Sequence, residues 1–353
     1  MTKRGWVREN IRKMSGYVPG EQPGKKKFVK LNTNENPYPP SPRVLEALIS
    51  EGTVDLRLYP DPDYGPLINR ASKVYGLPAS SILAGNGSDE LLSILTRVFV
   101  GEKDRVVYPS PTYTLYETLV SIQGGEPVQV PFPDDFSLPE NISSQKGKIL
   151  FLANPNSPSG TFVPTREIER MATKFHGIVV VDEAYVDFAQ DSAIGLVAKC
   201  ENLVVLRTLS KSFSLAGIRL GIALAPRWIT QEMKKVKDSY NVNRMTLAAG
   251  CAALGHISWM KRNVKKIIGT RKKLTAGLLS LGFSVFPSSA NFVLARIQGQ
   301  RLEWLFNELK KNRILVRYFD TKRLHDCLRI TVGTDEEVSA LLENLEKIMK
   351  KRD

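Results

Sequence analysis

Residues 208–219 read Thr-Leu-Ser-Lys-Ser-Phe-Ser-Leu-Ala-Gly-Ile-Arg and form the most informative segment of the chain. The segment places Lys211 among hydroxyl-bearing and small residues, between the apolar runs 203–206 and 220–225. A lysine amine in such surroundings can react with an aldehyde, and Ser210 and Arg219 would then hold a phosphate on the same molecule. The segment therefore predicts a lysine that carries pyridoxal 5'-phosphate (PLP). The ordinary alternative is a solvated lysine on a loop.

The composition is that of a globular protein with a sizeable core. The chain has 353 residues, of which 42% are hydrophobic and 24% charged, enough for one large and one small domain. The formal net charge of +14 would attract polyanions. However, the basic residues are spread along the whole chain, and no nucleic-acid-binding motif accompanies them. We therefore expect no nucleic-acid partner and a field that favours small anions such as phosphates and dicarboxylates.

The same inventory bears on location and on metal binding. No apolar run approaches the ~18 residues needed to span a bilayer, and no apolar signal segment follows the basic N-terminus. The three cysteines and three histidines are scattered along the chain. This distribution predicts free thiols in a cytoplasmic protein, no membrane association and no metal site.

The order of the expected elements is that of an α/β protein with a second, smaller α+β part. Residues 1–30 are expected to form an N-terminal arm, because glycines and prolines interrupt any regular period. Residues 31–245 are expected to form the large PLP-binding domain, where apolar strands alternate with helices and predict a mainly parallel, buried central sheet. Residues 246–353 are expected to form the small α+β domain.

The boundaries of the expected elements follow from periodicity and capping signals. Ser41-Pro42 reads as a helix start, with the serine as N-cap. Helices are expected at 88–99, 112–122, 165–175 and 227–238. Strands are expected at 105–108, 128–130, 149–152, 178–181 and 203–206. In the second domain we expect a basic helix at 257–281, strands near 283–286, 292–297, 314–317 and 328–332, and a last helix with capping-box spacing at 334–337.

Four other motifs indicate the same cofactor, and the clearest lies around Asp182. This carboxylate ends the run 178–181 at the carboxyl edge of the expected sheet, where it could pair with a pyridine nitrogen. Tyr185, three residues later, could donate to the cofactor's phenolic oxygen. A magnesium-binding aspartate would look similar, but it requires a phosphate-binding glycine loop that the sequence lacks.

The other three motifs are individually less specific. The glycines before Ser88, followed by an apolar helix, bring N–H groups together as in an anion site, although a capped helix explains them almost as well. Tyr113 follows a strand and could stack on the pyridine or belong to the core. Asn154 ends an apolar strand, so its amide could reach the cofactor oxygen, or it could simply begin a tight loop.

Together these motifs resemble those of the fold-type I PLP-dependent aminotransferases, and within them the histidinol-phosphate aminotransferases. The resemblance extends over nearly the whole chain, through the segments 7–11, 17–20, 31–37, 59–62, 291–296, 314–317 and 328–333. It implies PLP as cofactor and amino transfer between glutamate and imidazole-acetol phosphate, giving histidinol phosphate and 2-oxoglutarate in histidine biosynthesis. It also implies a homodimer with shared active sites.

The resemblance further implies a role for each residue that matches a family motif. The catalytic residues would be Lys211, Asp182 and Tyr185. The cofactor would also contact Gly87, Ser88, Asp89, Tyr113, Asn154, Ser210 and Arg219, together with Tyr59 of the neighbouring subunit. The substrate's anionic group would be held by Arg329 with help from Tyr17, Asn34 and Arg317.

Several other functions remain open at this point. An aromatic-amino-acid aminotransferase has the same sequence pattern, and a PLP-dependent phosphothreonine decarboxylase is a further possibility within the fold. A nucleic-acid-binding protein without catalytic activity would account for the charge but leaves Lys211, Asp182 and Arg219 unexplained. A PLP-sensing transcription regulator would need an N-terminal DNA-binding domain, which an arm of 30 residues does not supply.

Overall fold

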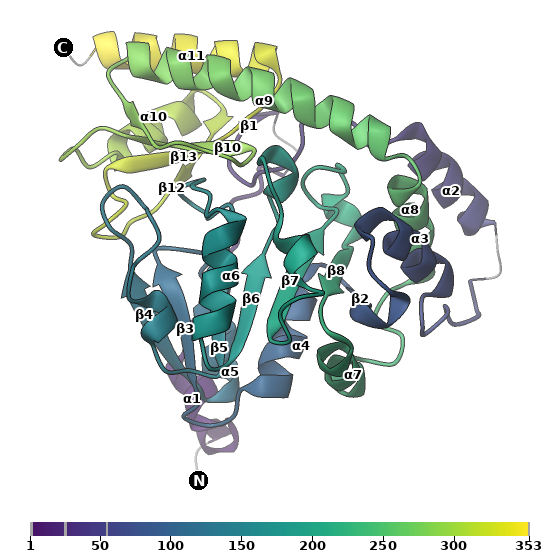
Figure 1. Ribbon diagram of the computed structural model, residues 1–353. Helices are drawn as coiled ribbons and strands as arrows, with labels where there is room; N and C mark the ends of the chain where they lie inside the picture. The colour runs from purple at the N-terminus through teal and green to yellow at the C-terminus, as the bar shows by residue number, and fades with distance from the viewer. Residues whose placement is uncertain (1–2, 25–26, 54–55, 352–353) are drawn as a thin grey trace.

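The computed structural model describes residues 3–24, 27–53 and 56–351 (Figure 1). A seven-stranded sheet with helices on both sides forms the larger part, and a smaller sheet with three helices lies above it in Figure 1. The expected α/β class with a mainly parallel sheet is confirmed. The domain boundaries at residues 30 and 245 stay a prediction.

The central sheet has the strand order β2-β8-β7-β6-β5-β3-β4. The strands are β2 (Ile82–Gly85), β3 (Arg105–Ser110), β4 (Glu126–Pro131), β5 (Ile149–Ala153), β6 (Ile178–Asp182), β7 (Leu203–Thr208) and β8 (Gly221–Leu224). The strands from β7 to β4 pair in parallel, whereas β8 runs antiparallel to β2 and β7. Every residue of β5, β6 and β7 is buried, because helices cover both faces of the sheet. This burial explains why these strands read as unbroken apolar runs.

The helices around this sheet agree with most of the expected positions. They are α4 (Ser88–Phe99), α5 (Leu115–Gln123), α6 (Thr165–Lys174) and α7 (Arg227–Val236). The helix expected from residue 112 begins three residues later, because residues 112–114 belong to the turn after β3. Five elements of this part had not been expected, namely α1 (Glu9–Lys13) in the arm, α3 (Gly65–Tyr75), α8 (Arg244–Leu254) and the strands β2 and β8.

The helix expected to start at Ser41-Pro42 is α2 (Pro42–Gly52), but its serine does not act as a side-chain cap. The Ser41 hydroxyl instead bonds Nδ1 of His256 at 2.7 Å, just ahead of the helix α9 (Ile257–Ser280). Ser41 thus occupies the predicted N-cap position, but its side chain makes no capping bond, because a distant partner competes for the same hydroxyl.

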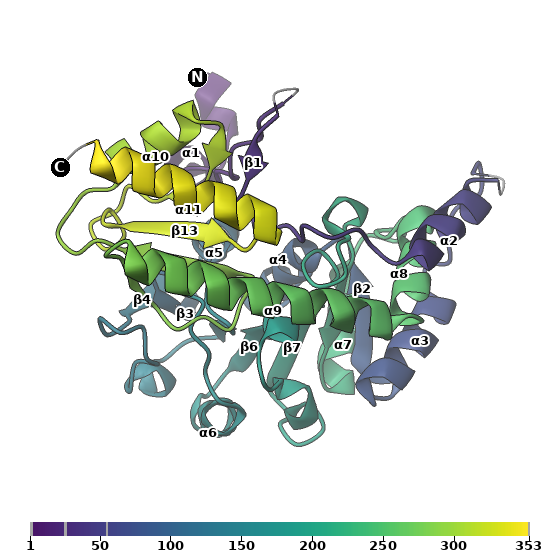
Figure 2. The same cartoon turned by 90° about the horizontal axis from the view of Figure 1, so that it is seen from above.

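The second sheet has the order β12-β13-β10-β9 and is antiparallel. Its strands are β9 (Ser284–Val285), β10 (Phe292–Arg296), β12 (Arg317–Tyr318) and β13 (Cys327–Thr331). The helices here are α9 (Ile257–Ser280), α10 (Glu303–Lys311), which had not been expected, and α11 (Asp335–Lys350). The capping box expected at 334–337 is confirmed. Figure 2 shows α9 extending from this sheet to α8, with α11 beside it.

The strand expected at 314–317 is interrupted, because its two halves pair with different partners. β11 (Ile314–Leu315) pairs in parallel with β1 (Val29–Lys30), while β12 joins the second sheet. The segment after β1 therefore starts beside the small sheet and continues toward the central one. Six short 3-10 helices complete the described elements: Lys3–Trp6, Ala79–Ser81, Ile142–Ser144, Val186–Phe188, Ala193–Leu196 and Ala216–Ile218.

Among the helices that the structure describes, none has the length and apolar character required to cross a bilayer. The parallel strands all present their carboxyl ends at one edge of the central sheet. In open α/β sheets this edge is where ligands bind. Asp182, Asn154 and Thr208 lie there, at or next to the ends of β6, β5 and β7.

Candidate active site

A cleft of about 290 Å³ opens between this edge, the arm and the second sheet. Most of the predicted site residues line it, namely Tyr17, Asn34, Ser88, Asp89, Tyr113, Asp182, Tyr185, Ser210, Lys211, Arg219, Arg317 and Arg329. Residues up to 312 positions apart in the sequence thus meet in one place. Gly87 precedes a lining residue, and Asn154 lies between two lining residues.

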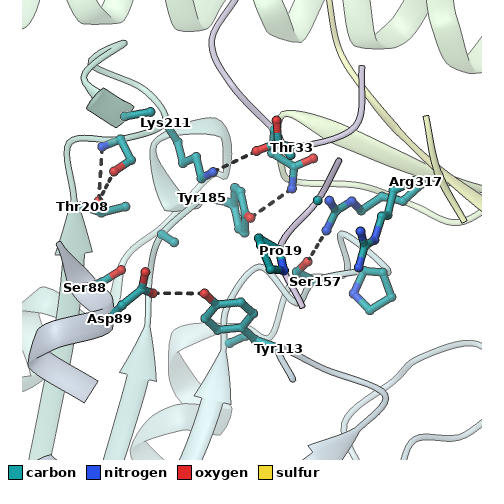
Figure 3. A pocket seen from close by; sticks show the side chains of 18 of the residues that line it. Pro19, Thr33, Ser88, Asp89, Tyr113, Ser157, Tyr185, Thr208, Lys211 and Arg317 are labelled. Atoms are coloured by element: carbon teal, nitrogen blue, oxygen red, sulfur yellow. Dashed lines mark hydrogen bonds between the residues drawn. The ribbon is translucent and has the colours of Figure 1, made fainter. Parts of the chain in front are cut away.

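Lys211 follows β7 and extends its side chain into the cleft (Figure 3). Its Nζ donates to the backbone carbonyl of Thr33 at 3.2 Å and lies 5.8 Å from the ring centroid of Tyr185. Its main chain is held as well, because the Asn36 amide donates to the carbonyls of Lys211 and Ser212, each at 3.1 Å. The amine is therefore presented on a constrained loop with only a carbonyl oxygen as acceptor.

Asp182 ends β6 with 5% of its surface exposed. Burial raises the pKa of this carboxyl to about 6, even though the hydroxyl of Tyr116 donates to it at 2.9 Å and the N–H of Ala184 at 3.2 Å. Among the residues that the structure describes, no lysine or arginine forms an ion pair with it. A cationic hydrogen-bond donor would therefore stabilise the charged form of this buried carboxylate.

The N-terminus of α4 and Arg219 form the anion-binding end of the cleft. Gly87 precedes the helix with φ +86°, a conformation that favours glycine, and a Cβ there would lie 2.6 Å from Nη2 of Arg219 and displace the guanidinium group. Helix N-termini expose free N–H groups that favour phosphate. Ser210 adds a hydroxyl beside that of Thr208, with 3.0 Å between the two oxygens.

Asp89 organises this end of the cleft with its side chain. One carboxylate oxygen accepts from Nη2 of Arg219 at 3.1 Å, and the other accepts from the Tyr113 hydroxyl at 3.1 Å. Because a carboxylate repels a phosphate, Asp89 would contribute its backbone N–H to an anion there. Tyr113 forms a wall of the cleft, with the ring of Tyr17 edge-on to it at 5.7 Å.

Two residues predicted to contact the cofactor have side chains that do not line this cleft. For the first, Asn154, the contact stays a prediction. Asn154 is fully buried, and its amide exchanges hydrogen bonds with the backbone of Val163, donating at 3.0 Å and accepting at 2.8 Å. Tyr59 is 75% exposed and stacks on Tyr240 with 4.3 Å between the ring centroids. Its predicted contact with a neighbouring subunit's cofactor stays a prediction.

Two arginines on adjacent strands lie at the end of the cleft that is opposite the N-terminus of α4. Arg317 of β12 lies directly opposite Arg329 of β13, and both line the cleft. Nη1 of Arg329 donates to Ser157 Oγ at 3.0 Å and Nη2 to the Asn32 carbonyl at 2.8 Å. Burial and the neighbouring Arg317 lower the pKa of Arg329 below its ordinary value, against the opposite influence of nearby tyrosines.

This arginine pair lacks a carboxylate partner within the described part of the chain, and Nε of Arg329 is buried there without a hydrogen-bond acceptor. Like charges opposite each other on neighbouring strands destabilise a sheet. An anion bound between the two guanidinium groups would remove this cost. The arrangement therefore suits a carboxylate or a phosphate.

Several residues that contribute to the site were not predicted from the sequence. Tyr116 bonds Asp182 from the first turn of α5, and its ring lies edge-on to that of Tyr113 at 5.6 Å. Behind Lys211, the Ser212 hydroxyl donates to Asp187, which forms a largely buried ion pair with Arg207. No local signal predicts that contact, because its members come from separate segments.

The residues in the cleft fit PLP chemically. The amine of Lys211 suits its aldehyde, and the buried carboxylate of Asp182, which lacks a cation within the described structure, suits a protonated ring nitrogen. The glycine before α4, together with Arg219, suits its phosphate. These groups lie in one cleft, so a single molecule can satisfy all of them.

Comparisons with known proteins agree with this assignment. The family model described as aminotransferase class I and II matches residues 26–345. A histidinol-phosphate aminotransferase of Rhodopirellula baltica is 45% identical over 346 residues, covering 97% of this chain and 96% of the relative. Histidinol-phosphate aminotransferase 1 of Trichormus variabilis is 42% identical over 347 residues, covering 98% of this chain and 99% of the relative.

A solved structure supports the same relationship in three dimensions. Histidinol-phosphate aminotransferase from Sinorhizobium meliloti, in complex with pyridoxal-5'-phosphate, superposes with a TM-score of 0.91 at 26% identity. The match covers 99% of this chain and 98% of the other. The chain therefore belongs to the class I and II aminotransferases and, within them, to the histidinol-phosphate aminotransferase family.

Proposed function

We propose that this chain is a PLP-dependent histidinol-phosphate transaminase. In the proposed reaction it transfers an amino group between glutamate and imidazole-acetol phosphate, producing 2-oxoglutarate and histidinol phosphate. The names of its relatives at 42–45% identity support this substrate pair, as does the chemistry of the cleft. The reaction belongs to histidine biosynthesis.

The observation that carries the proposal is the arginine pair in the cleft that holds Lys211. Arg317 and Arg329 lie opposite each other on β12 and β13, without a carboxylate partner among the described residues. A phosphate brings up to two negative charges to this pair, and glutamate brings a carboxylate that suits the same planar donors. Phenylalanine brings only an α-carboxylate with a single negative charge, so the phosphate of histidinol phosphate matches the two guanidinium groups better.

The chain's own groups divide the work of the reaction. PLP, when bound, supplies an aldehyde for amine exchange and a ring that accepts electron density. Asp182 would keep a proton on the ring nitrogen through its buried carboxylate. Nζ of Lys211 is the base placed to move the proton of the substrate's α-carbon. The arginine pair binds the substrate's anionic group and so orients that carbon.

The proposal includes a homodimer with shared sites and a cytoplasmic location. An exposed apolar surface supports the dimer. Its members lie on α2 and on the segment after it, namely Leu45, Ile49, Leu56, Leu58 and Tyr59. The free thiols of Cys200, Cys251 and Cys327 support a reducing compartment.

Steady-state kinetics with two amino donors test the function. With 2-oxoglutarate as acceptor and PLP present, we expect kcat/KM for histidinol phosphate to exceed that for phenylalanine at least about a hundredfold, or roughly 2.7 kcal/mol. Equal rates would favour the aromatic alternative.

Borohydride treatment of the PLP-loaded protein, followed by mass spectrometry, should place the cofactor on Lys211. An adduct on another lysine would contradict the assignment.

A further inference from the structure

Asn34 has an unusual position between the two sheets. It is 1% exposed and adopts φ +56°, a left-handed conformation that asparagine tolerates better than most residues. Its backbone N–H donates to Oγ1 of Thr331 at 3.0 Å, and its carbonyl accepts from the Asn291 amide at 3.0 Å. Thr331 ends β13 and Asn291 precedes β10, so the second sheet determines where Asn34 lies.

These bonds also determine which way the Asn34 amide points. The Thr331 hydroxyl oxygen already accepts the backbone N–H of Asn34, so it offers its own proton to Asn34 Oδ1, at 3.0 Å. The NH₂ group must then face the other way. There it donates to the hydroxyl oxygen of Tyr185 at 3.0 Å, across 151 positions of sequence.

The hydrogen bond from Asn34 determines where the Tyr185 hydroxyl can donate its own proton. A phenol oxygen that accepts a hydrogen bond keeps its own O–H free, and accepting one bond strengthens the bond that it donates. Tyr185 lines the cleft beside Lys211, with its ring edge against Phe292 at 5.0 Å. Its O–H can therefore donate to a ligand in the cleft and not to the protein behind it.

We propose that Asn34 is a positioning residue that keeps the Tyr185 hydroxyl as a donor toward the bound cofactor, and that Thr331 sets the orientation of its amide. The contact with the substrate's anionic group that the family resemblance implies for Asn34 stays a separate prediction. The inference rests on the proposed function, because it requires PLP in this cleft. It also links the second sheet, which carries Arg329, to a group that faces the cofactor.

A double-mutant cycle tests the inference through PLP binding. The dissociation constant of PLP would be measured by fluorescence titration of cofactor-free protein for the unaltered chain, Asn34→Gly, Tyr185→Phe and the double variant. Glycine suits φ +56° and removes only the amide side chain. We expect Asn34→Gly to weaken PLP binding about tenfold, the size of one hydrogen bond, and less than about twofold when Tyr185→Phe is also present.

Equal losses in both backgrounds would overturn the inference, because the amide would then act independently of the Tyr185 hydroxyl. Thr331→Val and Thr331→Ser form a matched pair. The first removes the hydroxyl and should reproduce the coupled loss, whereas the second keeps it and should bind PLP within about twofold of the unaltered protein. If Thr331→Val leaves PLP binding unchanged although the cofactor-free protein is folded by circular dichroism, Thr331 does not orient the amide and this part of the proposal falls.

The experiment also separates this inference from the proposed function. An unaltered protein that neither binds PLP nor transaminates histidinol phosphate would overturn both. An unaltered protein that does both, but shows no coupling between Asn34 and Tyr185, would overturn the positioning role alone.

Discussion

At the scale of single residues, Asp182 shows how burial prepares a group for its partner. Its carboxyl is buried at the end of β6, and burial outweighs the Tyr116 hydroxyl and the Ala184 N–H that favour the charged form. The cofactor-free protein therefore holds a carboxyl whose ionisation costs free energy. A cationic partner would remove that cost, which gives the residue a measurable pH dependence.

We expect the cofactor-free protein to lose stability through Asp182 as the pH rises. The pKa is about 6 in the folded state against 3.8 ordinarily, so the folded state binds the extra proton in that interval. The stabilising contribution is full below pH about 4 and is lost as the pH rises through about 6, on the order of 2–3 kcal/mol. Urea unfolding of cofactor-free wild type and Asp182→Asn across this range would measure it. A difference between the two that is independent of pH would contradict the assignment.

Arg329 is the second residue whose role in binding can be tested by a single substitution. Lysine would keep the positive charge but lose the planar set of donors, so Arg329→Lys should weaken glutamate and histidinol phosphate together, each by about 1.5–3 kcal/mol. Single-turnover measurement of each half-reaction gives both values. Arg301→Lys, at an exposed arginine that pairs with Glu303 and Asp320, is the matched control and should change neither. Loss of glutamate binding alone would indicate that Arg317 holds the phosphate.

At the scale of elements, helix ends show which local signals are reliable. The capping box of α11 forms as expected, with the Thr334 hydroxyl accepting from the Glu337 N–H at 3.2 Å and the Glu337 carboxylate accepting from the Thr334 N–H at 2.8 Å. All of its partners lie within one turn. Ser41 has an equally good capping position at α2, yet its hydroxyl bonds His256. A capping signal read from neighbouring residues therefore predicts the hydrogen bond correctly only where no distant group competes for the same hydroxyl.

The α11 cap should contribute measurably to stability. Thr334→Ala leaves the Glu337 N–H without its acceptor, and we expect the free energy of unfolding to fall by about 1 kcal/mol. Glu343→Ala, at an exposed position within the same helix, should change it by less than about 0.5 kcal/mol. Urea unfolding followed by circular dichroism compares the two variants, and equal effects would show that the cap is not the cause.

At the scale of the whole molecule, one group of exposed apolar side chains lies on and after α2, and none of its members lines the cleft. Ile49 is 72% exposed and Leu58 52%, on and after the helix α2 at the far right of Figure 1. Tyr59, in the same segment, stacks on Tyr240 and lines no part of its own chain's cleft. A dimer that buries this surface would place Tyr59 beside a second chain.

Mixing two inactive variants tests the shared site. Lys211→Ala chains lack the amine that acts as the base in their own cleft. Tyr59→Ala chains would lack the tyrosine that reaches into the cleft of the partner chain. We expect the mixture to regain activity that rises with the content of hybrid dimers, because one cleft of each hybrid is intact. No recovery in proven hybrids, although Tyr59→Ala alone is strongly impaired, would contradict a site built from two chains.

The surface itself can be tested in the same mixture. Adding Ile49→Glu to both chains should abolish the recovery and shift the protein toward monomers in light scattering. Leu279→Glu serves as control, because Leu279 is 54% exposed on α9, away from the proposed interface. Dimers that tolerate Ile49→Glu would place the interface elsewhere.

The sequence by itself determined the cofactor, the α/β class and most element positions. Those conclusions depend on local information. The runs that became β5, β6 and β7 are apolar because both faces are covered, and Asp182 lies at the end of one of them. Since parallel strands bring their carboxyl ends to one edge, strand order along the chain was enough to place Asp182 and Lys211 together.

The tertiary structure alone decided how the groups in the cleft are held and oriented. The Tyr116 hydroxyl reaches Asp182 across 66 positions, and the Asn34 amide reaches Tyr185 across 151. The opposition of Arg317 and Arg329 depends on the register of β12 against β13. Such contacts join segments that pack together only in the folded chain. Local periodicity specifies which face of an element is buried, but not which distant side chain meets it there.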